Sequence, residues 1–269
     1  MTRNLSSFYD FSLDYLIKQT QPLIDQEKLS IQDLLDYTTK TDIETPDYSL
    51  KDAFGKLIHC LQDYQYMPKV INYDARKQKI DEILFDLDCE KIVEEWTGET
   101  LFYKFCDEFP ISNADSPRNS WLKFSKGVVS AAQFMTMFKS KDEFTAFLDC
   151  FAYNQHTREA LPLLLSAKIF GIQFALACNW IKELGLTEYP KPDIHMVKVF
   201  HALSVCQEDQ IECYRAMLMI ANKCNVTAYQ LDKVVWLICS GDYYRQKVSI
   251  KEKKLRDRFI AEIEKYDWK

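Results

Sequence analysis

The sequence has little glycine and little proline, only 6 and 8 of its 269 residues. Sheets joined by tight turns usually need more of both, so their scarcity favours helices. The sequence also lacks the run of about 18 uncharged apolar residues that a membrane span requires. Residues 1–10 contain no apolar block like that of a signal peptide. These absences predict a helical, cytoplasmic protein.

The paired cysteines of a zinc site are missing too. None of the nine cysteines is arranged as C-x-x-C. Most lie in apolar helical patterns, as Cys178 and Cys239 do, where a buried thiol behaves as a small hydrophobe. We therefore expect reduced thiols, no structural metal and no cofactor.

The net charge of −6 is not that of a typical nucleic-acid binder, but the charges are unevenly divided. Residues 1–116 carry 12 basic and 23 acidic side chains, whereas residues 117–269 carry 22 and 17. The stretch 117–139 holds four basic residues and no acidic one: Arg118, Lys123, Lys126 and Lys139. DNA binding needs a local basic face rather than a basic total. This stretch is a candidate for that face, although an ordinary solvated surface carries similar charges.

Apolar residues recur at helical spacing along most of the chain, and hydrophobic residues make up 47% of it. A first helix is expected near residues 8–17, and a short second helix follows an N-cap at Ser30. A third helix is expected at 50–66 and is ended by Pro68. Further helices are expected near 74–87, 118–138, 141–152, 155–168, 174–185, 194–204, 208–223, 227–240 and 251–267. Residues 110–119 form the clearest break and coincide with the charge reversal. We predict an all-α fold of two helical lobes, residues 1–116 and 117–269.

Two local features of the second lobe could carry chemistry. Residues 169–173 form a short glycine-containing turn between helices, which can aim backbone N–H groups at a phosphate. Taken alone, a single glycine between helices, such as Gly171, is more often a plain helix C-cap. Residues 189–200 approach a helix through two prolines and place Asp193 at its start. Taken alone, Asp193 is a favoured N-cap that would bond the amides of residues 195 or 196.

Together these features resemble the helix-hairpin-helix DNA glycosylase superfamily. In its members a glycine-containing hairpin is followed along the sequence by a helix, a short linker and an aspartate at the start of the next helix. Gly171 and Asp193 are 22 residues apart, the separation found in a member of the family. Residues 232–241 look like the family's late helix, which ends in a Trp-Leu-Ile-x-x-Gly element. The resemblance covers about residues 118–244.

The resemblance implies base-excision repair of duplex DNA. Such proteins flip one nucleotide into a cleft between two helical lobes and cut its N-glycosidic bond. It makes Asp193 the catalytic carboxylate. It assigns DNA contacts to the hairpin and nearby lysines, namely Phe170, Gly171, Ile172, Gln173, Lys123, Lys126, Lys168 and Lys191. The base-pocket candidates are Trp121, Tyr153 and His195, although aromatic rings of helical proteins are commonly core residues and His195 could be purely structural.

The chain departs from the family pattern at several positions. Members that also nick DNA carry a lysine where this chain has Ala175. Gln173 replaces the hairpin's second glycine, and Phe170 replaces the proline before the first. Cys206 and Cys213 begin the spacing of the family's iron–sulfur cluster, but Ala216 interrupts it. The resemblance thus implies a monofunctional glycosylase, a hydrolase without a metal cluster.

Two alternatives remain open at this point. The chain could be a DNA-binding relative that has lost catalysis, or a helical protein-interaction module that has kept only the fold. A basic face around residues 118–139 and 168–198 would favour DNA binding. The modified base, the role of residues 1–116 and the oligomeric state are not fixed by the sequence.

Overall fold

The described chain is helical apart from one short β-hairpin. The computed structural model describes residues 5–39, 48–64 and 67–268. The helices are α1 (Phe8–Ile24), α2 (Ile31–Thr39), α3 (Leu50–Gln62), α4 (Met67–Ile71), α5 (Tyr73–Ile83), the 3-10 turn η1 (Phe85–Leu87), α6 (Cys89–Glu95), α7 (Gly98–Glu108), α8 (Ser120–Met135), α9 (Lys141–Asp149), α10 (Gln155–Lys168), α11 (Phe174–Glu183), α12 (Ile194–Ala202), α13 (Gln210–Lys223), α14 (Ala228–Ser240) and α15 (Leu255–Lys265). Strands β1 (Asp242–Tyr243) and β2 (Val248–Ser249) pair antiparallel between α14 and α15. The predicted all-α fold is confirmed.

The chain forms two compact units, which we describe separately. Unit 1 joins Met1–Thr45 with Ile181–Lys269, and unit 2 runs from Pro46 to Trp180. The charge reversal at residue 116, on which the sequence-based lobes were drawn, lies inside unit 2. The predicted division into two lobes at 116/117 stays a prediction. No helix in the described ranges is long and apolar enough to cross a membrane.

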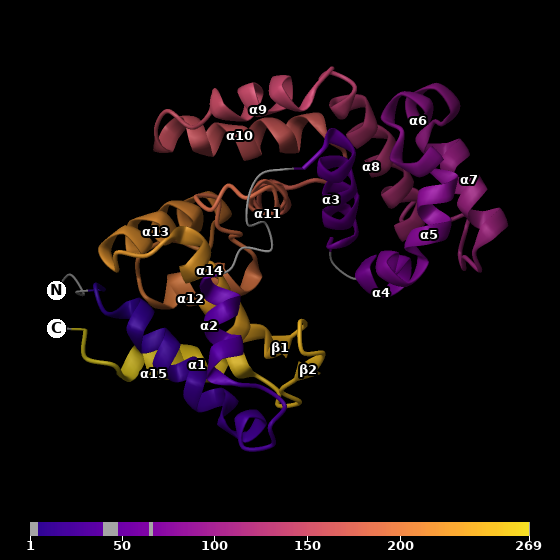
Figure 1. The fold of residues 1–269 in the computed structure, drawn as a ribbon. Coiled ribbons are helices and arrows are strands. Elements are labelled where there is room, and N and C mark those ends of the chain that lie inside the picture. Colours follow the sequence, from indigo (N-terminus) through magenta and orange to yellow (C-terminus); the bar gives the residue numbers. More distant parts are fainter. Residues whose placement is uncertain (1–4, 40–47, 65–66, 269) are drawn as a thin grey trace. The chain divides into compact units, whose positions relative to one another are not determined.

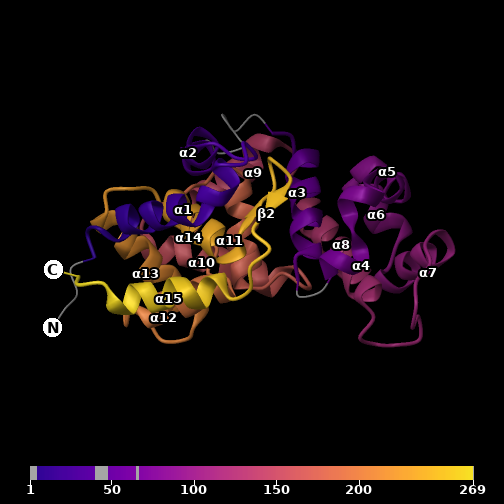
Figure 2. The ribbon, with the colours of Figure 1, turned by 90° about the horizontal axis from the view of Figure 1, so that it is seen from below.

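Unit 1 is built around α14, which packs against α1, α2, α12, α13 and α15 (Figure 1, Figure 2). Its residues Leu231, Val234 and Leu237 are fully buried in one continuous apolar core. Helices α1 and α15 come from opposite ends of the sequence and are joined by aromatic contacts such as Phe11 on Phe259. These long-range contacts place the segment that contains Asp193 on a packed scaffold.

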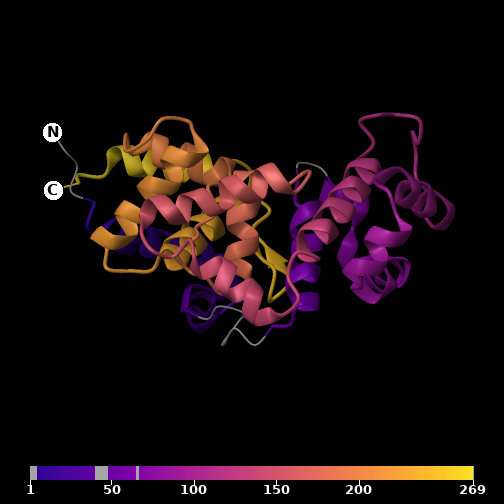
Figure 3. The same ribbon diagram turned by 90° about the horizontal axis from the view of Figure 1, so that it is seen from above.

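Unit 2 is organised by α8, which packs against α3, α4, α6 and α7 (Figure 1, Figure 3). Small residues on α8 allow this close packing. Gly127 is an example, because a Cβ there would lie 2.8 Å from Cδ2 of Leu61. The helix also supports the hairpin between α10 and α11.

Both N-caps that the sequence predicts, Ser30 and Asp193, begin a helix. Ser30 and Asp33 exchange hydrogen bonds at the start of α2, and Ser49 and Asp52 form a capping box at α3. Each cap satisfies amides that have no partner inside the helix. The ends of helices were predicted less well, since α3 already ends at Gln62 and Pro68 lies in the first turn of α4. The hairpin β1–β2 was not predicted.

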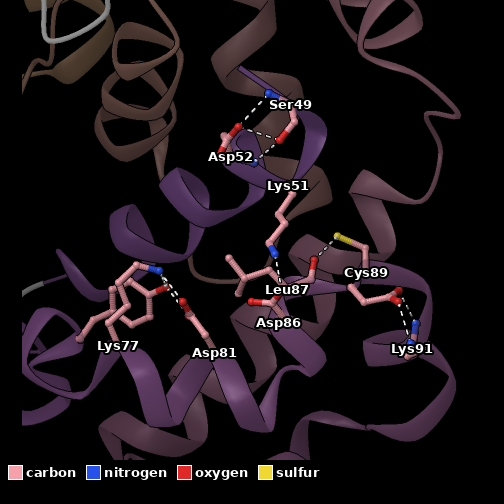
Figure 4. A network of polar contacts seen from close by, with 11 residues as sticks. Ser49, Lys51, Asp52, Lys77, Asp81, Asp86, Leu87, Cys89 and Lys91 are labelled. Carbon is pink, nitrogen blue, oxygen red and sulfur yellow. Dashed lines mark hydrogen bonds and ion pairs between the residues drawn. The ribbon is translucent and has the colours of Figure 1, made fainter. Parts of the chain in front are cut away.

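A left-handed turn joins α5 to α6. Phe85, Asp86 and Leu87 all have positive φ, between 52° and 65°, a conformation that disfavours residues with a Cβ. The surrounding contacts hold it in place (Figure 4). Lys51 of α3 forms an ion pair with Asp86 at 2.5 Å, and Phe85 stacks on Trp96. The turn is thereby fastened to α3 and to Trp96, the residue that ends α6.

Candidate functional site

The hairpin between α10 and α11 reverses the chain within five residues. Helix α10 ends at Lys168, and Gly171 then adopts φ +85°, which favours glycine. Ile172 N–H donates to the Ile169 carbonyl at 3.3 Å, and α11 begins at Phe174. The turn is therefore a helix-hairpin-helix element within unit 2.

Side chains of α8 fix the position of this hairpin. Phe170 N–H donates to Ser130 Oγ at 3.0 Å, and that hydroxyl donates to the Lys168 carbonyl at 3.3 Å. A Cβ on Gly127 would lie only 3.1 Å from the Phe170 carbonyl oxygen. The sequence analysis missed both supports, because neither residue has a local signal that links it to a turn some 40 positions away.

A groove of about 570 Å³ lies beside the hairpin, wholly within unit 2. It is lined by Tyr64, Met67, Lys123, Ser130 and residues 166–173, together with Leu61. The N–H groups of Gly171 and Gln173 donate to no other residue in the described part of the chain. Unused backbone donors beside a lysine are suited to a phosphate oxygen.

The predicted basic residues differ in how available they are. The Lys123 ammonium lies 5.9 Å from the centre of the Tyr64 ring, at the groove. Lys126 is already in an ion pair with Glu99 at 2.8 Å. Lys168 is exposed at the end of α10. Lys123 and Lys168 are therefore more available than Lys126 to an anion outside the chain.

Asp193 belongs to unit 1 and caps α12. Pro190 and Pro192 keep the approach extended, and Asp193 has φ −75° and ψ −179°. Its Oδ1 accepts hydrogen bonds from the amides of His195 at 2.8 Å and Met196 at 3.2 Å. The predicted N-cap is thus confirmed. No described residue donates to the second oxygen, Oδ2, so half of the carboxylate is left for another partner.

His195 follows in the first turn of α12. Burial lowers the pKa of His195 below its usual range, and Arg256 and Lys191 act in the same direction, whereas the Asp193 carboxylate opposes them. Its buried Nδ1 has no hydrogen-bond partner within the described residues. The imidazole is therefore neutral at neutral pH.

A buried ion pair, which the sequence analysis also missed, holds the backbone of residues 191–193 in place. Lys182 Nζ lies 2.6 Å from Asp232 Oδ2, and their side chains are 6% and 3% exposed. The same carboxylate oxygen accepts the Lys191 amide at 2.9 Å, and the Lys191 carbonyl accepts the Asp193 amide at 2.8 Å. The pair thus fixes the backbone that leads to Asp193.

The aromatic candidates lie in contrasting environments. Trp121 is buried, stacks on Phe109 and has the Arg76 guanidinium 5.5 Å from its ring centre, which favours a role in the core over stacking on a base. Tyr153 is 86% exposed, and Phe170 at the hairpin is 50% exposed. Both rings have surface available for an additional partner.

The described part of the chain offers no group of three or more His, Cys, Asp or Glu side chains that could hold a metal ion. At the position of the nicking enzymes' lysine, Ala175 is buried in the first turn of α11. Its methyl group can neither donate a hydrogen bond nor act as a nucleophile. The chemistry available in these segments is that of a carboxylate, a neutral imidazole, backbone amides and the ammonium groups of Lys168 and Lys191.

Comparison with known proteins supports the fold. No protein-family model matches the chain, and a search of curated proteins gives no match. Among solved structures, the chain is similar to the 8-oxoguanine glycosylase/lyase of Methanocaldococcus jannaschii, crystallised in complex with a 15mer DNA containing 8-oxoguanine. The TM-score is 0.52 at 16% identity, covering 83% of this chain and 96% of that chain. The likeness thus extends beyond residues 118–244, and the fold resembles that of a helix-hairpin-helix glycosylase.

Proposed function

We propose that the chain is a DNA-binding base-excision protein, a monofunctional DNA N-glycosylase that hydrolyses the N-glycosidic bond of a modified base. The observation that carries the proposal is the hydrogen bonding of the Asp193 carboxylate. Two amides hold Oδ1 in place, while Oδ2 has no donor among the described residues. The carboxylate is therefore both fixed in position and open to a substrate or a water molecule. A fold that resembles a glycosylase supports this role.

The reaction needs little beyond this carboxylate. As the bond between sugar and base breaks, positive charge develops on the sugar, and a fixed carboxylate stabilises that charge. The base leaves with the electron pair of the broken bond and takes up a proton from solvent. A water molecule attacks the anomeric carbon and gives up a proton to the carboxylate, which then releases that proton to solvent. The products are a free base and an abasic site in an intact strand. Because the resemblance aligns Ala175 with the lysine of the members that nick DNA, water would be the nucleophile.

DNA would be held by the hairpin and its groove. The amides of Gly171 and Gln173 and the Lys123 ammonium would contact one phosphate, as donors at a helix-hairpin-helix turn can. Lys168 and Lys191 would add electrostatic attraction, and Lys126 less because Glu99 already pairs with it. Among the aromatic candidates, the exposed Tyr153 and Phe170 rings are free to stack on a base.

The test is base release from duplexes that each carry one modified base, measured for the wild type and for Asp193→Asn. Asparagine is also a good N-cap, so the substitution preserves the start of α12. We expect turnover to fall by about 10²- to 10⁴-fold. The affinity for DNA should be unchanged or higher, because a negative charge near phosphate is lost.

Asp209→Asn is a matched control. Asp209 caps α13 in the same way, accepting the amides of Ile211 and Glu212 at 2.9 Å. This variant makes the same change of charge and of cap, and it should keep wild-type base release. An Asp193→Asn variant that remains as active as the control would refute the assignment. DNA binding without base release from any duplex would instead favour an inactive DNA-binding relative.

A further inference from the structure

The positive charge of residues 117–269 is concentrated in one short segment. Residues 245–258 contain seven basic and two acidic side chains. This excess alone accounts for the whole positive balance of residues 117–269. The segment runs from the turn of the β1–β2 hairpin to the first turn of α15, all within unit 1. This basic segment belongs to unit 1, whereas the predicted basic stretch 117–139 belongs to unit 2.

The two acidic residues of the segment are already paired. Asp257 lies 3.2 Å from Arg256, and Glu252 forms an ion pair with Arg258. Four exposed lysines remain, and none has a carboxylate within ion-pair distance in the described part of the chain: Lys247, Lys251, Lys253 and Lys254. We call these four residues the lysine surface. None of its four charges is neutralised by a direct ion pair within the described residues.

The turn that carries Lys247 is held rigidly against α2. The Tyr37 hydroxyl accepts the Arg245 amide at 2.6 Å and donates to Gln246 Oε1 at 2.9 Å. Gln246 Nε2 in turn donates to Asp33 Oδ1 at 2.9 Å. The Arg245 guanidinium lies 4.6 Å from the centre of the Tyr37 ring. The cation at the tip of the turn is thus presented by an ordered backbone.

The second half of the surface is fixed by close packing at the end of α14. Gly241 has φ +63°, and a Cβ there would clash with Cδ1 of Leu255. Ile250 N–H donates to the Gly241 carbonyl at 2.8 Å. Lys247 and Lys254 also have positive φ, of 55° and 62°. Both turns therefore place a lysine where the backbone would accept glycine or asparagine more easily.

The lysine surface adjoins the segment that contains Asp193. Arg256, two residues after Lys254, lies close enough to His195 to help lower its pKa. Helices α12 and α15 pack together, and they lie side by side in Figures 1 and 2. A polyanion bound to the lysine surface would therefore pass near the start of α12, where Asp193 is found.

We propose that the lysine surface binds the phosphate backbone of duplex DNA beside Asp193, as a second contact in addition to the α10–α11 hairpin. The inference rests on the proposed function for the choice of duplex DNA as the partner. A regular polyanion matches uncompensated cations that are fixed along a turn and a helix start. Among residues 241–258, Tyr244 is the only large exposed apolar side chain, so the surface lacks the apolar anchors of a membrane-binding or protein-docking face.

The test is the salt dependence of duplex binding by the full chain. A variant in which all four lysines of the surface are replaced by glutamine should lose about 0.9 per phosphate contact from the slope of log affinity against log salt, or roughly 3 to 4 in total. Affinity at low salt should fall at least about tenfold. The control replaces four exposed lysines elsewhere by glutamine: Lys28, Lys69, Lys91 and Lys223. It makes the same change in net charge and should keep most of the slope.

The outcomes separate this inference from the proposed function. Wild-type affinity and slope in the surface variant, or equal losses in both variants, would overturn the inference even if the wild type releases a base. A surface variant that binds DNA normally but no longer binds phosphatidylserine vesicles would also overturn it. Conversely, a wild type that shows lysine-dependent duplex binding but releases no base would support the inference while the proposed function fails.

Discussion

Breaking the ion pair between Lys182 and Asp232 should destabilise the protein strongly. Burial alone would lower the pKa of Lys182, but the carboxylates of Asp232, Glu183 and Asp193 raise it above its usual range, so the ammonium is charged at neutral pH. Lys182→Met keeps much of the side-chain volume but leaves the Asp232 carboxylate buried without its cation. Removing one partner of such a pair costs about 3–5 kcal/mol. We expect the free energy of unfolding to fall by that amount.

The double variant tests whether the cost comes from the stranded charge. Lys182→Met/Asp232→Asn leaves no buried charge, and the new amide oxygen can still accept the Lys191 N–H. It should be only about 1–3 kcal/mol less stable than the wild type, far less than the sum of the two single variants. Urea unfolding followed by circular dichroism measures all four proteins. A single variant within about 1 kcal/mol of the wild type, or strictly additive losses, would refute the reasoning.

The same pair should control local motion before Asp193. Asp232 Oδ2 accepts the Lys191 amide, and the Lys191 carbonyl accepts the Asp193 amide. In Lys182→Met we therefore expect hydrogen exchange at the Lys191 and Asp193 amides to accelerate by more than the exchange within α13. Equal acceleration everywhere would mean that only global stability has changed.

Two further predictions concern the type of reaction and the dependence of stability on pH. Because Ala175 offers no amine, borohydride should trap no covalent adduct between protein and DNA, and the strand should stay intact until alkali cleaves the abasic site; a trapped adduct would contradict the assignment. The lowered pKa of His195 means that the unfolded chain takes up this proton at a higher pH than the folded chain. Stability should therefore fall, by at most about 1.4 kcal/mol per pH unit, as the pH drops from the usual histidine range through the lowered pKa. Unfolding at about pH 7.5 and about pH 5 should show this loss in the wild type and in the exposed control His156→Gln, and a smaller loss in His195→Gln; equal losses in all three would exclude His195 as the cause.

The elements that the sequence predicts well are those set by local chemistry. The helices from α8 to α15 lie within a few residues of their expected positions, because apolar spacing and caps such as Asp193 act over a single turn. The left-handed turn at residues 85–87 was not predicted, since nothing local favours positive φ there. It is stabilised by Lys51, which lies 35 residues away from Asp86 in the sequence.

Long-range partners explain what the sequence could not show of the site. Lys182 and Asp232 are 50 residues apart, and Tyr37 and Arg245 are 208 apart. A lysine or tyrosine on an amphipathic helix gives no sign of which distant residue it will contact. A count of charge in short windows would, however, have found residues 245–258, because seven basic residues among fourteen are visible without any structure.

The structure also changes how the two interpretations of Asp193 relate to each other. A capping aspartate and a catalytic aspartate look like alternatives in the sequence, because either role explains the residue type at the start of a helix. A carboxylate has two oxygens, however, and here both capping bonds are made by Oδ1. The cap fixes the orientation of the group, and Oδ2 keeps its lone pairs for a sugar cation or a water molecule. Capping is thus the means by which α12 would hold a catalytic carboxylate in place, and Asp209, which caps α13 in the same way, allows the two roles to be separated by experiment.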